Sequence, residues 1–428
     1  MTRTTIALGV LLGLAVAPAA LHAAPLVLGV LGDSLSDEYS EASYGAYAQN
    51  WVQQLAIYHG VNLGPTATAA GQPGNTWNEP RRRGYEYNWA RAGAATSTLL
   101  SGGQDTGLAA QIPVKGITHA ILAIGANDFN PGGAAYSSIY NGDWSTITID
   151  DYINQRVANV TTALNTVLPT GVKLAIVNFP DYSVAPATQA GYPDPTKRDR
   201  VTAAVARVNA GLDALAQSKQ IPRVDLFGAS HAIFGTNALP KTSLLLGNVT
   251  IDLNQVDTPS GGDPTAGFNH DGVHPNTTLQ GILANLFMRA LDMGYGADVP
   301  MFSEQEILAH RGIAYGGSET LTSQLGLLSG YVANYAPPLP KAGDVNGDNL
   351  VNIFDINFVS THWGETGPAG DSNRDGLVNI FDINQISANW NNDYSGDSMA
   401  VPEPGGLALA GFALGLLLGV AKLRRRET

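Results

Sequence analysis

The sequence predicts an α/β domain, with a parallel sheet between two layers of helices, followed by a small α-helical domain. Two observations lead to this prediction. Over residues 25–335, short apolar runs of strand length alternate with stretches of helical periodicity. Over residues 343–392, an acidic segment occurs twice. Strand, helix and strand in succession favour a parallel sheet, whose functional site lies at the carboxyl ends of the strands.

The expected elements of the large domain follow from its apolar residues. Buried strands are expected at residues 26–30, 120–124, 174–177 and 224–227, with a further strand at 85–89. Helices with one buried face are expected where apolar residues recur at spacings of three and four. These residues are Ile153, Val157, Val160, Leu164 and Val167 in one helix, and Val201, Val205, Val208, Leu212 and Leu215 in another.

Length, charge and cysteine content exclude several classes of protein. The chain of 428 residues is too long for one ordinary domain. Its formal net charge of −13 disfavours a nucleic-acid partner, because such proteins carry basic faces. The absence of cysteine excludes disulfides, a zinc–thiolate site and a cysteine nucleophile.

The amino-terminal segment has the pattern of a secretory signal peptide. Arg3 precedes an apolar stretch at residues 6–17, and small residues continue to Ala24. We therefore expect residues 1–24 to be removed and the mature chain, from residue 25, to be exported.

The carboxyl-terminal segment has the pattern of a membrane anchor. Residues 405–421 are uncharged and would form a helix of about 26 Å, near the shortest length that spans a bilayer. The basic cluster at 422–426 would hold the chain end in the cytoplasm. With Pro402-Glu403-Pro404 upstream, residues 401–428 resemble the PEP-CTERM sorting signal of Gram-negative bacteria. The resemblance implies cleavage by an exosortase-type protease and a place in the cell envelope, at the cell surface or outside the cell; a plain tail anchor is the alternative.

The repeated acidic segment predicts two calcium loops. Side-chain oxygens at loop positions 1, 3, 5, 9 and 12, with a backbone carbonyl at position 7, match the six or seven ligands that Ca²⁺ prefers. A structural Ca²⁺ would stabilise a small module that has no disulfides. The expected ligands are Asp344, Asn346, Asp348, Leu350, Asn352 and Asp355 in the first loop, and Asp371, Asn373, Asp375, Leu377, Asn379 and Asp382 in the second.

Together with a short helix expected after each loop, residues 343–392 resemble a type I dockerin, set between linkers at 336–342 and 393–400. The resemblance implies a cohesin-like partner. In that family, loop positions 10 and 11 usually carry small or polar residues that contact the cohesin. Here they are Ile353-Phe354 and Ile380-Phe381, which is atypical. These pairs either pack the two repeats together or form an apolar docking surface.

Four polar blocks lie where a site is expected. Three follow strands: Gly32-Asp33-Ser34-Leu35-Ser36-Asp37, Ala92-Gly93-Ala94 and Gly125-Ala126-Asn127-Asp128. The fourth, Asp271-Gly272-Val273-His274-Pro275, precedes a helix. In this order the blocks resemble the SGNH, or GDSL, hydrolase family over nearly the whole domain. The resemblance implies a flavodoxin-like three-layer α/β/α fold and hydrolysis of esters.

The same resemblance assigns roles that the chemistry of the residues supports. Ser34 is the expected nucleophile, and Asp271 and His274 complete the triad that removes its proton. Gly93 and Asn127 are the expected oxyanion donors, together with the N–H of Ser34. Asp33 and Asp128 are interpreted as turn or capping residues, and His270 as a loop residue. No cofactor is expected for catalysis.

The sequence therefore predicts a secreted or surface-routed serine esterase or lipase that works through an acyl-enzyme. A polysaccharide O-deacetylase with the same triad is the first alternative, and an inactive surface scaffold protein is the second. An acyl lipid, a short acyl ester and an acylated polysaccharide all remain open as substrates.

Overall fold

The computed structural model describes most of the chain as two compact units that divide at residue 340. The predicted signal peptide and the predicted PEP-CTERM segment lie outside the described residues. Within the described part, no helix is long and apolar enough to cross a membrane. The described residues are 26–39, 44, 47–78, 83–321, 328–337, 341–365, 369–373 and 377–392.

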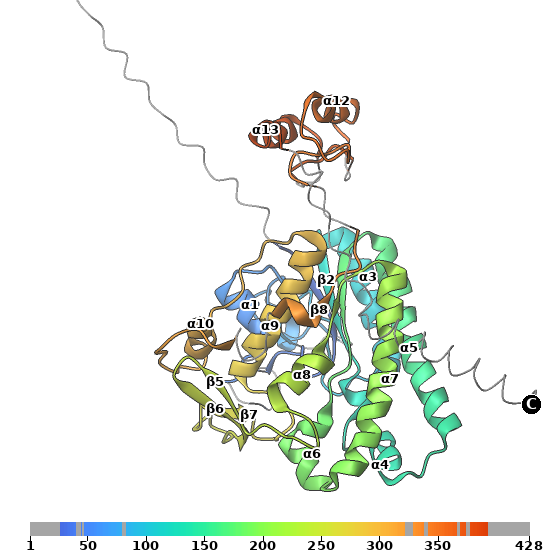
Figure 1. The fold of residues 1–428 in the computed structure, drawn as a ribbon, viewed down its shortest axis with the longest axis vertical. Coiled ribbons are helices and arrows are strands. Elements are labelled where there is room, and N and C mark those ends of the chain that lie inside the picture. The colour runs from blue at the N-terminus through green and yellow to red at the C-terminus, as the bar shows by residue number, and fades with distance from the viewer. Residues whose placement is uncertain are drawn as a thin grey trace, which may run out of the picture. The chain divides into compact units, whose positions relative to one another are not determined.

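The large unit is built on a five-stranded sheet (Figure 1). Its strands, in spatial order, are β1 (Leu28–Gly32), β2 (His119–Ala123), β3 (Lys173–Val177), β4 (Arg223–Val224) and β8 (Val332–Ala333). The first four run parallel, as predicted, whereas β8 pairs antiparallel with β4. The sheet is therefore mixed, because a two-residue strand from the end of the unit closes its edge.

Two predicted strands differ in the structure. Residues 85–89 lie beside β1, where Val30 N–H donates to the Tyr87 carbonyl at 3.0 Å and Trp89 N–H donates to the Val30 carbonyl at 2.9 Å. A turn closed by Asn88 N–H and the Tyr85 carbonyl interrupts this segment, so it forms no regular strand. Residues 226–227 begin a helix instead of continuing β4, because the Asp225 side chain accepts a hydrogen bond from Gly228 N–H and caps that helix.

Helices cover both faces of the sheet, so the three-layer α/β/α architecture is confirmed (Figure 1). Alternate strand residues enter two separate cores: Val30 and Ile121 lie in one, and Leu31 and Leu122 in the other. The first core is closed by α1 (Trp51–Tyr58), α8 (Leu226–Phe234) and α9 (Thr277–Tyr295). The second is closed by α2 (Thr96–Ser101), α3 (Gln104–Lys115), α4 (Ala134–Asn141), α5 (Thr146–Val167) and α7 (Pro195–Lys219).

A second, three-stranded sheet was not predicted. It consists of β5 (Ser243–Leu246), β6 (Val249–Val256) and β7 (Ala266–Phe268). Strand β7 leads into a loop that ends at α9. This sheet therefore positions the fourth polar block. Two further short helices, α6 (Pro186–Gly191) and α10 (Glu304–Ala309), complete the unit.

The small unit contains two matching helices, α12 (Ile353–Thr361) and α13 (Ile380–Ala388). Each begins at a capping box, formed by Asn352 with Asp355 in the first repeat and by Asn379 with Asp382 in the second. Its core is made by Val351, Val359, Val378 and Ile386.

Candidate active site

Ser34 lies in the turn directly after β1. The N–H groups of Ser36 and Asp37 donate to the carbonyl of Asp33 at 3.0 and 2.9 Å, which closes the turn. The side chain at position 32 must be absent, because a Cβ on Gly32 would lie 2.6 Å from the carbonyl oxygen of Ala123. Strand β1 has β2 on one side and residues 87–91 on the other, so its carboxyl end lies where chain connections leave in opposite directions, a usual place for a site.

The loop between β7 and α9 places His274 beside Ser34. Nε2 of His274 lies 2.7 Å from Oγ of Ser34, and its Nδ1 lies 2.5 Å from Oδ2 of Asp271. The loop is held at both ends, since Asn269 N–H donates to the His274 carbonyl at 2.8 Å and Asn276 N–H donates to the Gly267 carbonyl at 2.9 Å. The structure thus brings together the three predicted triad residues.

The electrostatics of Asp271 suit an ion pair with the imidazole. Burial acts to raise the pKa of Asp271, but hydrogen bonds from the His274 side chain and from the N–H groups of His274 and Val273 lower that pKa below its ordinary value. An ionised Asp271 accepts a hydrogen bond from the N–H at Nδ1 of His274. The lone pair of Nε2 is then left to accept the hydroxyl proton of Ser34.

The predicted oxyanion donors are held in neighbouring turns. Within the described residues, the N–H groups of Ser34 and Gly93 donate to no acceptor, so both are open to a ligand. Nδ2 of Asn127 donates one hydrogen to the Ala94 carbonyl at 3.0 Å, and its Oδ1 accepts from Asn130 at 3.1 Å. These two bonds orient the amide, and its second hydrogen remains for an oxyanion.

Two carboxylates, of which Asp33 is buried and Asp37 is half-buried, tie the three strand-end blocks together. Oδ2 of Asp33 accepts from Ala126 N–H at 3.2 Å, and Oδ2 of Asp37 accepts from Ala92 N–H at 2.7 Å. Ala126 precedes Asn127 and Ala92 precedes Gly93, so these bonds draw both donor residues toward the Ser34 turn. Burial raises the pKa of Asp33 to about 7. In the structure Asp33 acts as a turn residue, which agrees with its interpretation from the sequence.

The Asp128 carboxylate likewise ties a strand-end block to the rest of the fold, because it binds the start of α2. Its carboxylate accepts from Thr96 N–H at 2.9 Å, from the Thr96 hydroxyl at 2.8 Å and from Nε of Arg156 at 2.9 Å. Arg156, on α5, was missed by sequence reasoning because nothing in a helical pattern marks a partner on another element. Burial nevertheless raises the pKa of Asp128 above its ordinary value.

Tyr44 is a further site residue that the sequence did not reveal. Its hydroxyl oxygen lies 3.1 Å from Nε2 of His274, and the two ring centroids are 4.5 Å apart. No motif surrounds Tyr44 that would have singled it out. His270, by contrast, is not the histidine that reaches Ser34.

The first predicted calcium loop is folded around its two terminal carboxylates. Asp344 accepts from Gly347 N–H at 2.8 Å and from Asn349 N–H at 2.9 Å. Asp355 accepts from Val345 N–H at 2.9 Å, which brings the first and last loop positions together. Asn349 has a φ of 69°, the left-handed conformation required at position 6. This donor set fits a hard cation.

The second loop is described in part, because Asp375 lies outside the described residues. Its last carboxylate, Asp382, accepts from Asn373 N–H at 3.1 Å and from Asn379 N–H at 2.7 Å. In the described part of the chain no group of three or more His, Cys, Asp or Glu side chains suits a metal. A calcium shell in these loops would therefore need the Asn side chains and backbone carbonyls as well.

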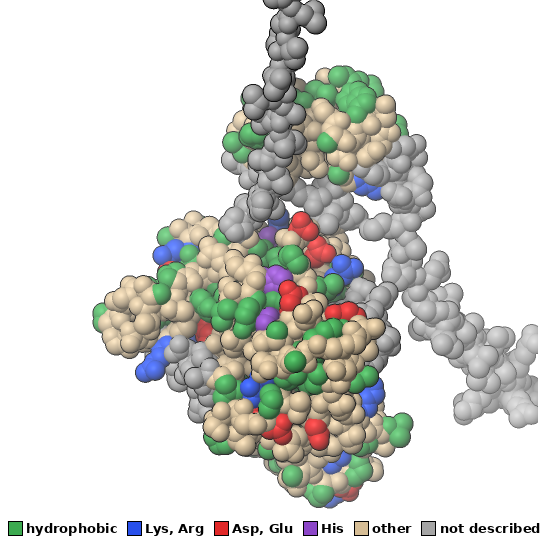
Figure 2. Space-filling view, turned by 90° about the vertical axis from the view of Figure 1, so that its left-hand side faces the viewer, with side chains coloured by type: hydrophobic (Ala, Val, Ile, Leu, Met, Phe, Trp, Pro, Cys, Tyr) green, Lys and Arg blue, Asp and Glu red, His purple; other side chains and the backbone are tan. Residues whose placement is uncertain are grey.

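The apolar pairs at positions 10 and 11 of the loops are exposed. Ile353 and Phe354 are 52% and 63% exposed, and Ile380 and Phe381 are 52% and 46% exposed. These side chains do not pack the two repeats together, because the core of the small unit is formed by Val351, Val359, Val378 and Ile386. Hydrophobic side chains are visible on the surface of the small unit in Figure 2.

Comparison with known proteins identifies one family model. Residues 28–287 match the model described as GDSL-like lipase/acylhydrolase. No curated protein matches the chain.

Solved structures similar to the chain include three bacterial proteins of low sequence identity. An acetylxylan esterase from Geobacillus stearothermophilus is 16% identical, with a TM-score of 0.34, over 63% of this chain and 95% of that chain. An extracellular lipase from Streptomyces rimosus is 18% identical, with a TM-score of 0.32, over 58% and 92%. A putative acylhydrolase from Bacteroides fragilis is 14% identical, with a TM-score of 0.33, over 62% and 86%.

Proposed function

The chain belongs to the GDSL-like lipase/acylhydrolase family of ester-hydrolysing enzymes, and we propose that it acts as a serine esterase through Ser34, His274 and Asp271. The 2.7 Å separation between Nε2 of His274 and Oγ of Ser34 carries this proposal. A serine hydroxyl is a weak nucleophile unless a base within hydrogen-bond distance removes its proton.

In the first half of the reaction, Oγ of Ser34 attacks the ester carbonyl carbon while its proton passes to Nε2 of His274. The negative charge that develops on the carbonyl oxygen is stabilised by the N–H groups of Ser34 and Gly93 and by Nδ2 of Asn127. Collapse of the tetrahedral species breaks the bond to the alcohol, which leaves with the proton held on Nε2. An acyl-enzyme on Ser34 remains.

In the second half, water attacks the acyl carbon and gives its proton to Nε2. Collapse returns that proton to Oγ of Ser34 and releases the carboxylic acid. Asp271 stays ionised throughout and stabilises the imidazolium that forms twice. The reaction needs no metal or organic cofactor in this scheme.

We also propose that the small unit binds Ca²⁺ through its two loops. Asp344 and Asp355 are buried, and they accept hydrogen bonds from the backbone of a loop whose other expected ligands are Asn346, Asp348, the Leu350 carbonyl and Asn352. A bound Ca²⁺ would neutralise these carboxylates and stabilise the loops. The exposed apolar pairs support a docking role toward a partner, which the dockerin resemblance suggests is cohesin-like but atypical.

Export and surface processing complete the proposal. They rest on the sequence patterns at residues 1–24 and 401–428. We propose on this basis that the enzyme acts in the envelope, on the surface or in the surroundings of a Gram-negative cell, with exosortase-type processing at the carboxyl terminus.

The triad is tested by three variants of the mature chain assayed on p-nitrophenyl esters. Ser34→Ala and His274→Ala should each lower kcat/KM by about a thousandfold or more, because members of one catalytic unit fail together. His270→Ala is the matched control and should retain turnover. Circular dichroism checks that each variant is folded. Turnover by Ser34→Ala, or equal losses at both histidines, would overturn the assignment.

A further inference from the structure

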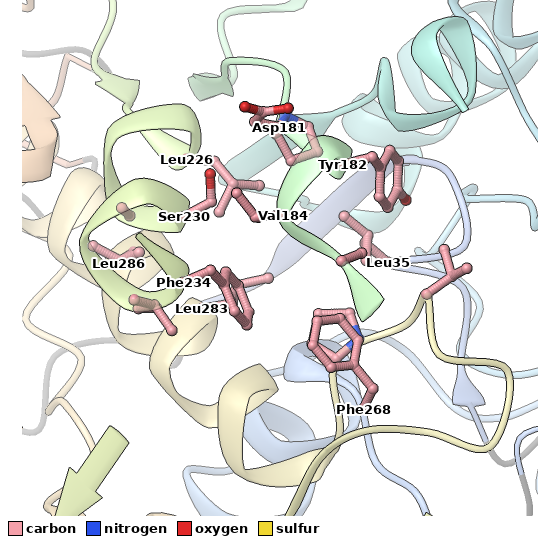
Figure 3. Close-up of a pocket in the computed structure, with 16 residues that line it drawn as sticks. Leu35, Asp181, Tyr182, Val184, Leu226, Ser230, Phe234, Phe268, Leu283 and Leu286 are labelled. Atoms are coloured by element: carbon pink, nitrogen blue, oxygen red, sulfur yellow. The ribbon is translucent and has the colours of Figure 1, made fainter. Parts of the chain in front are cut away.

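An apolar pocket lies next to the catalytic residues, between α8 and the loop that follows β3 (Figure 3). We propose that this pocket binds the acyl chain of the substrate, so that the enzyme prefers esters of longer hydrocarbon acids to acetyl esters. The inference rests on the proposed esterase function and names its substrate class.

The position of the pocket connects it to the reacting atoms. Leu35, which follows the nucleophile Ser34, forms part of the lining, and so do Val273 and Pro275, on either side of His274. Tyr182 lines the same pocket. Burial is the main cause that raises the pKa of Tyr182 above its ordinary value. The charges of Asp33 and Asp271 also raise it, because Tyr182 lies close to the triad.

Two of the three polar side chains of the lining, Asp181 and Ser230, are already satisfied within the protein. Asp181 accepts from Ser183 N–H at 2.9 Å and from the Thr202 hydroxyl at 2.8 Å, and it pairs with Nε2 of His231 at 2.8 Å. The hydroxyl of Ser230 donates to the Phe227 carbonyl at 2.8 Å. Tyr182 is then the one lining side chain, among the described residues, whose polar group has no such bond.

This chemistry favours a hydrocarbon over a sugar. Sugar hydroxyls lose hydrogen bonds to water when they enter a site, and the site must replace those bonds. A methylene group has no such requirement and gains from burial against Leu226, Phe234 and Leu283. The pocket therefore suits an acyl chain and does not suit a sugar ring of an acetylated polysaccharide.

The lining residues give the direction in which an acyl chain would lie. The space between them, about 560 Å³, includes open solvent and is therefore an upper limit on what the pocket can hold. Leu35 and Tyr182 lie at one end, and Leu283 and Leu286 of α9 lie toward the other, across the face of α8 (Figure 3). A chain that enters past Leu35 would run toward α9.

The test compares the mature enzyme on p-nitrophenyl acetate, butyrate, hexanoate and octanoate. We expect kcat/KM to rise about fourfold per methylene until the pocket is filled, which is the gain from burying one methylene. A second series, the acetates of ethanol, butanol and octanol, separates the acyl side from the alcohol side. Its kcat/KM should change little with chain length.

Two variants alter the pocket in opposite directions. Ala229→Phe puts a larger side chain of α8 into the pocket, which narrows it. This variant should lower the octanoate-to-acetate ratio of kcat/KM by about tenfold or more. Phe234→Ala puts a smaller side chain in the lining, which enlarges the pocket. This variant should prefer a longer acyl chain than the parent does. Ala232→Phe is the matched control, because Ala232 is on the same helix, is half-buried and does not line the pocket. Its ratio should match that of the parent.

The outcomes separate the two proposals. If acetate and acetylated xylan are turned over faster than octanoate, or if the alcohol series carries the length dependence, the acyl pocket is overturned while the esterase stands. If no ester is hydrolysed, the esterase proposal fails and this inference fails with it. If the variants do not fold, rates of inactivation of the parent by p-nitrophenyl phosphonates with ethyl and octyl chains decide the question, and equal rates would overturn the pocket.

Discussion

The hydroxyl of Tyr44 lies 3.1 Å from Nε2 of His274. The same nitrogen lies 2.7 Å from Oγ of Ser34. A neutral imidazole whose Nδ1 carries the proton has one lone pair on Nε2, so only one of the two hydroxyls can donate to it at a time. Burial raises the pKa of Tyr44 above its ordinary value, and Tyr44 therefore remains a protonated donor that competes with the nucleophile.

Tyr44→Phe should raise kcat/KM by about twofold to tenfold, the range that corresponds to one net hydrogen bond. The substitution removes the competing donor and keeps the aromatic ring beside the imidazole. Tyr44→Ala also removes the ring and should lower kcat, because the imidazole loses a packing partner. Steady-state kinetics on one p-nitrophenyl ester measure both. A loss in Tyr44→Phe would instead mean that the hydroxyl stabilises the imidazolium.

Asn127→Ala should lower kcat about a hundredfold with a modest change in KM. The amide is needed most when charge develops on the carbonyl oxygen, and its orientation is set by the bonds to Ala94 and Asn130. Asn127→Asp should be worse, since a carboxylate repels that charge. Separate determination of kcat and KM distinguishes the roles: a raised KM with unchanged kcat would make Asn127 a ground-state binding residue.

Local motifs explain how far the site could be predicted from the sequence. Ser34, Gly93 and Asn127 each belong to a short block at the end of an apolar run, and the parallel sheet brings such ends to one edge. Tyr44 lies 230 residues from His274 and belongs to no such block. A single contact between distant segments has no local pattern, so it becomes visible only in the fold.

The errors in the fold have similarly local causes. Leu226 and Phe227 continue an apolar run after Val224, which resembles a strand, but the cap provided by Asp225 starts a helix there. The two residues of β8 are too few to produce a periodic signal. In β5 and β6 of the second sheet, exposed residues alternate with buried ones. The eight residues of β6 therefore lack the continuous apolar run by which the buried parallel strands were predicted.

Arg156→Met should lower the free energy of unfolding by about 2–4 kcal/mol, because it leaves the fully buried Asp128 carboxylate without its cationic partner. Arg207→Met is the matched control. Arg207 pairs with Asp150 on the surface, where both side chains are about half exposed and such pairs contribute less than about 1 kcal/mol. Urea denaturation of the two variants measures the difference. Equal effects would show that the hydrogen bonds from Thr96 are enough to stabilise the buried Asp128 carboxylate.

Glu38→Gln should become more stable relative to the parent as the pH rises from about 5 to about 8. Burial, followed by the charge of Asp37, raises the pKa of Glu38 to about 8 from an ordinary value of 4.5. The folded protein therefore keeps a proton that the unfolded chain releases, and the stabilisation from this group disappears as the pH rises through 8. The difference should grow by up to about 1.4 kcal/mol per pH unit. Urea denaturation of both proteins at pH 5, 6.5 and 8 measures it, and a constant difference would contradict the shift.

Calcium should stabilise the small unit and leave ester hydrolysis nearly unchanged. In the first loop, Asp344 and Asp355 are buried close together, and a cation would relieve their repulsion. The large unit forms its own two cores and its own triad. In calorimetry of the full chain, Ca²⁺ should therefore raise, and a chelator should lower, the melting temperature of one transition, while turnover of p-nitrophenyl esters stays within about twofold.

The double variant Asp344→Ala, Asp371→Ala removes the first ligand of each loop and should abolish that calcium response while turnover persists. Asp143→Ala, which changes an exposed carboxylate of the large unit, is the control and should keep the response. A calcium response that survives in the double variant would place the ion elsewhere. Loss of turnover in the double variant, with the large unit still folded by calorimetry, would show that the small unit acts on the Ser34 site, because neither substituted residue belongs to the catalytic machinery.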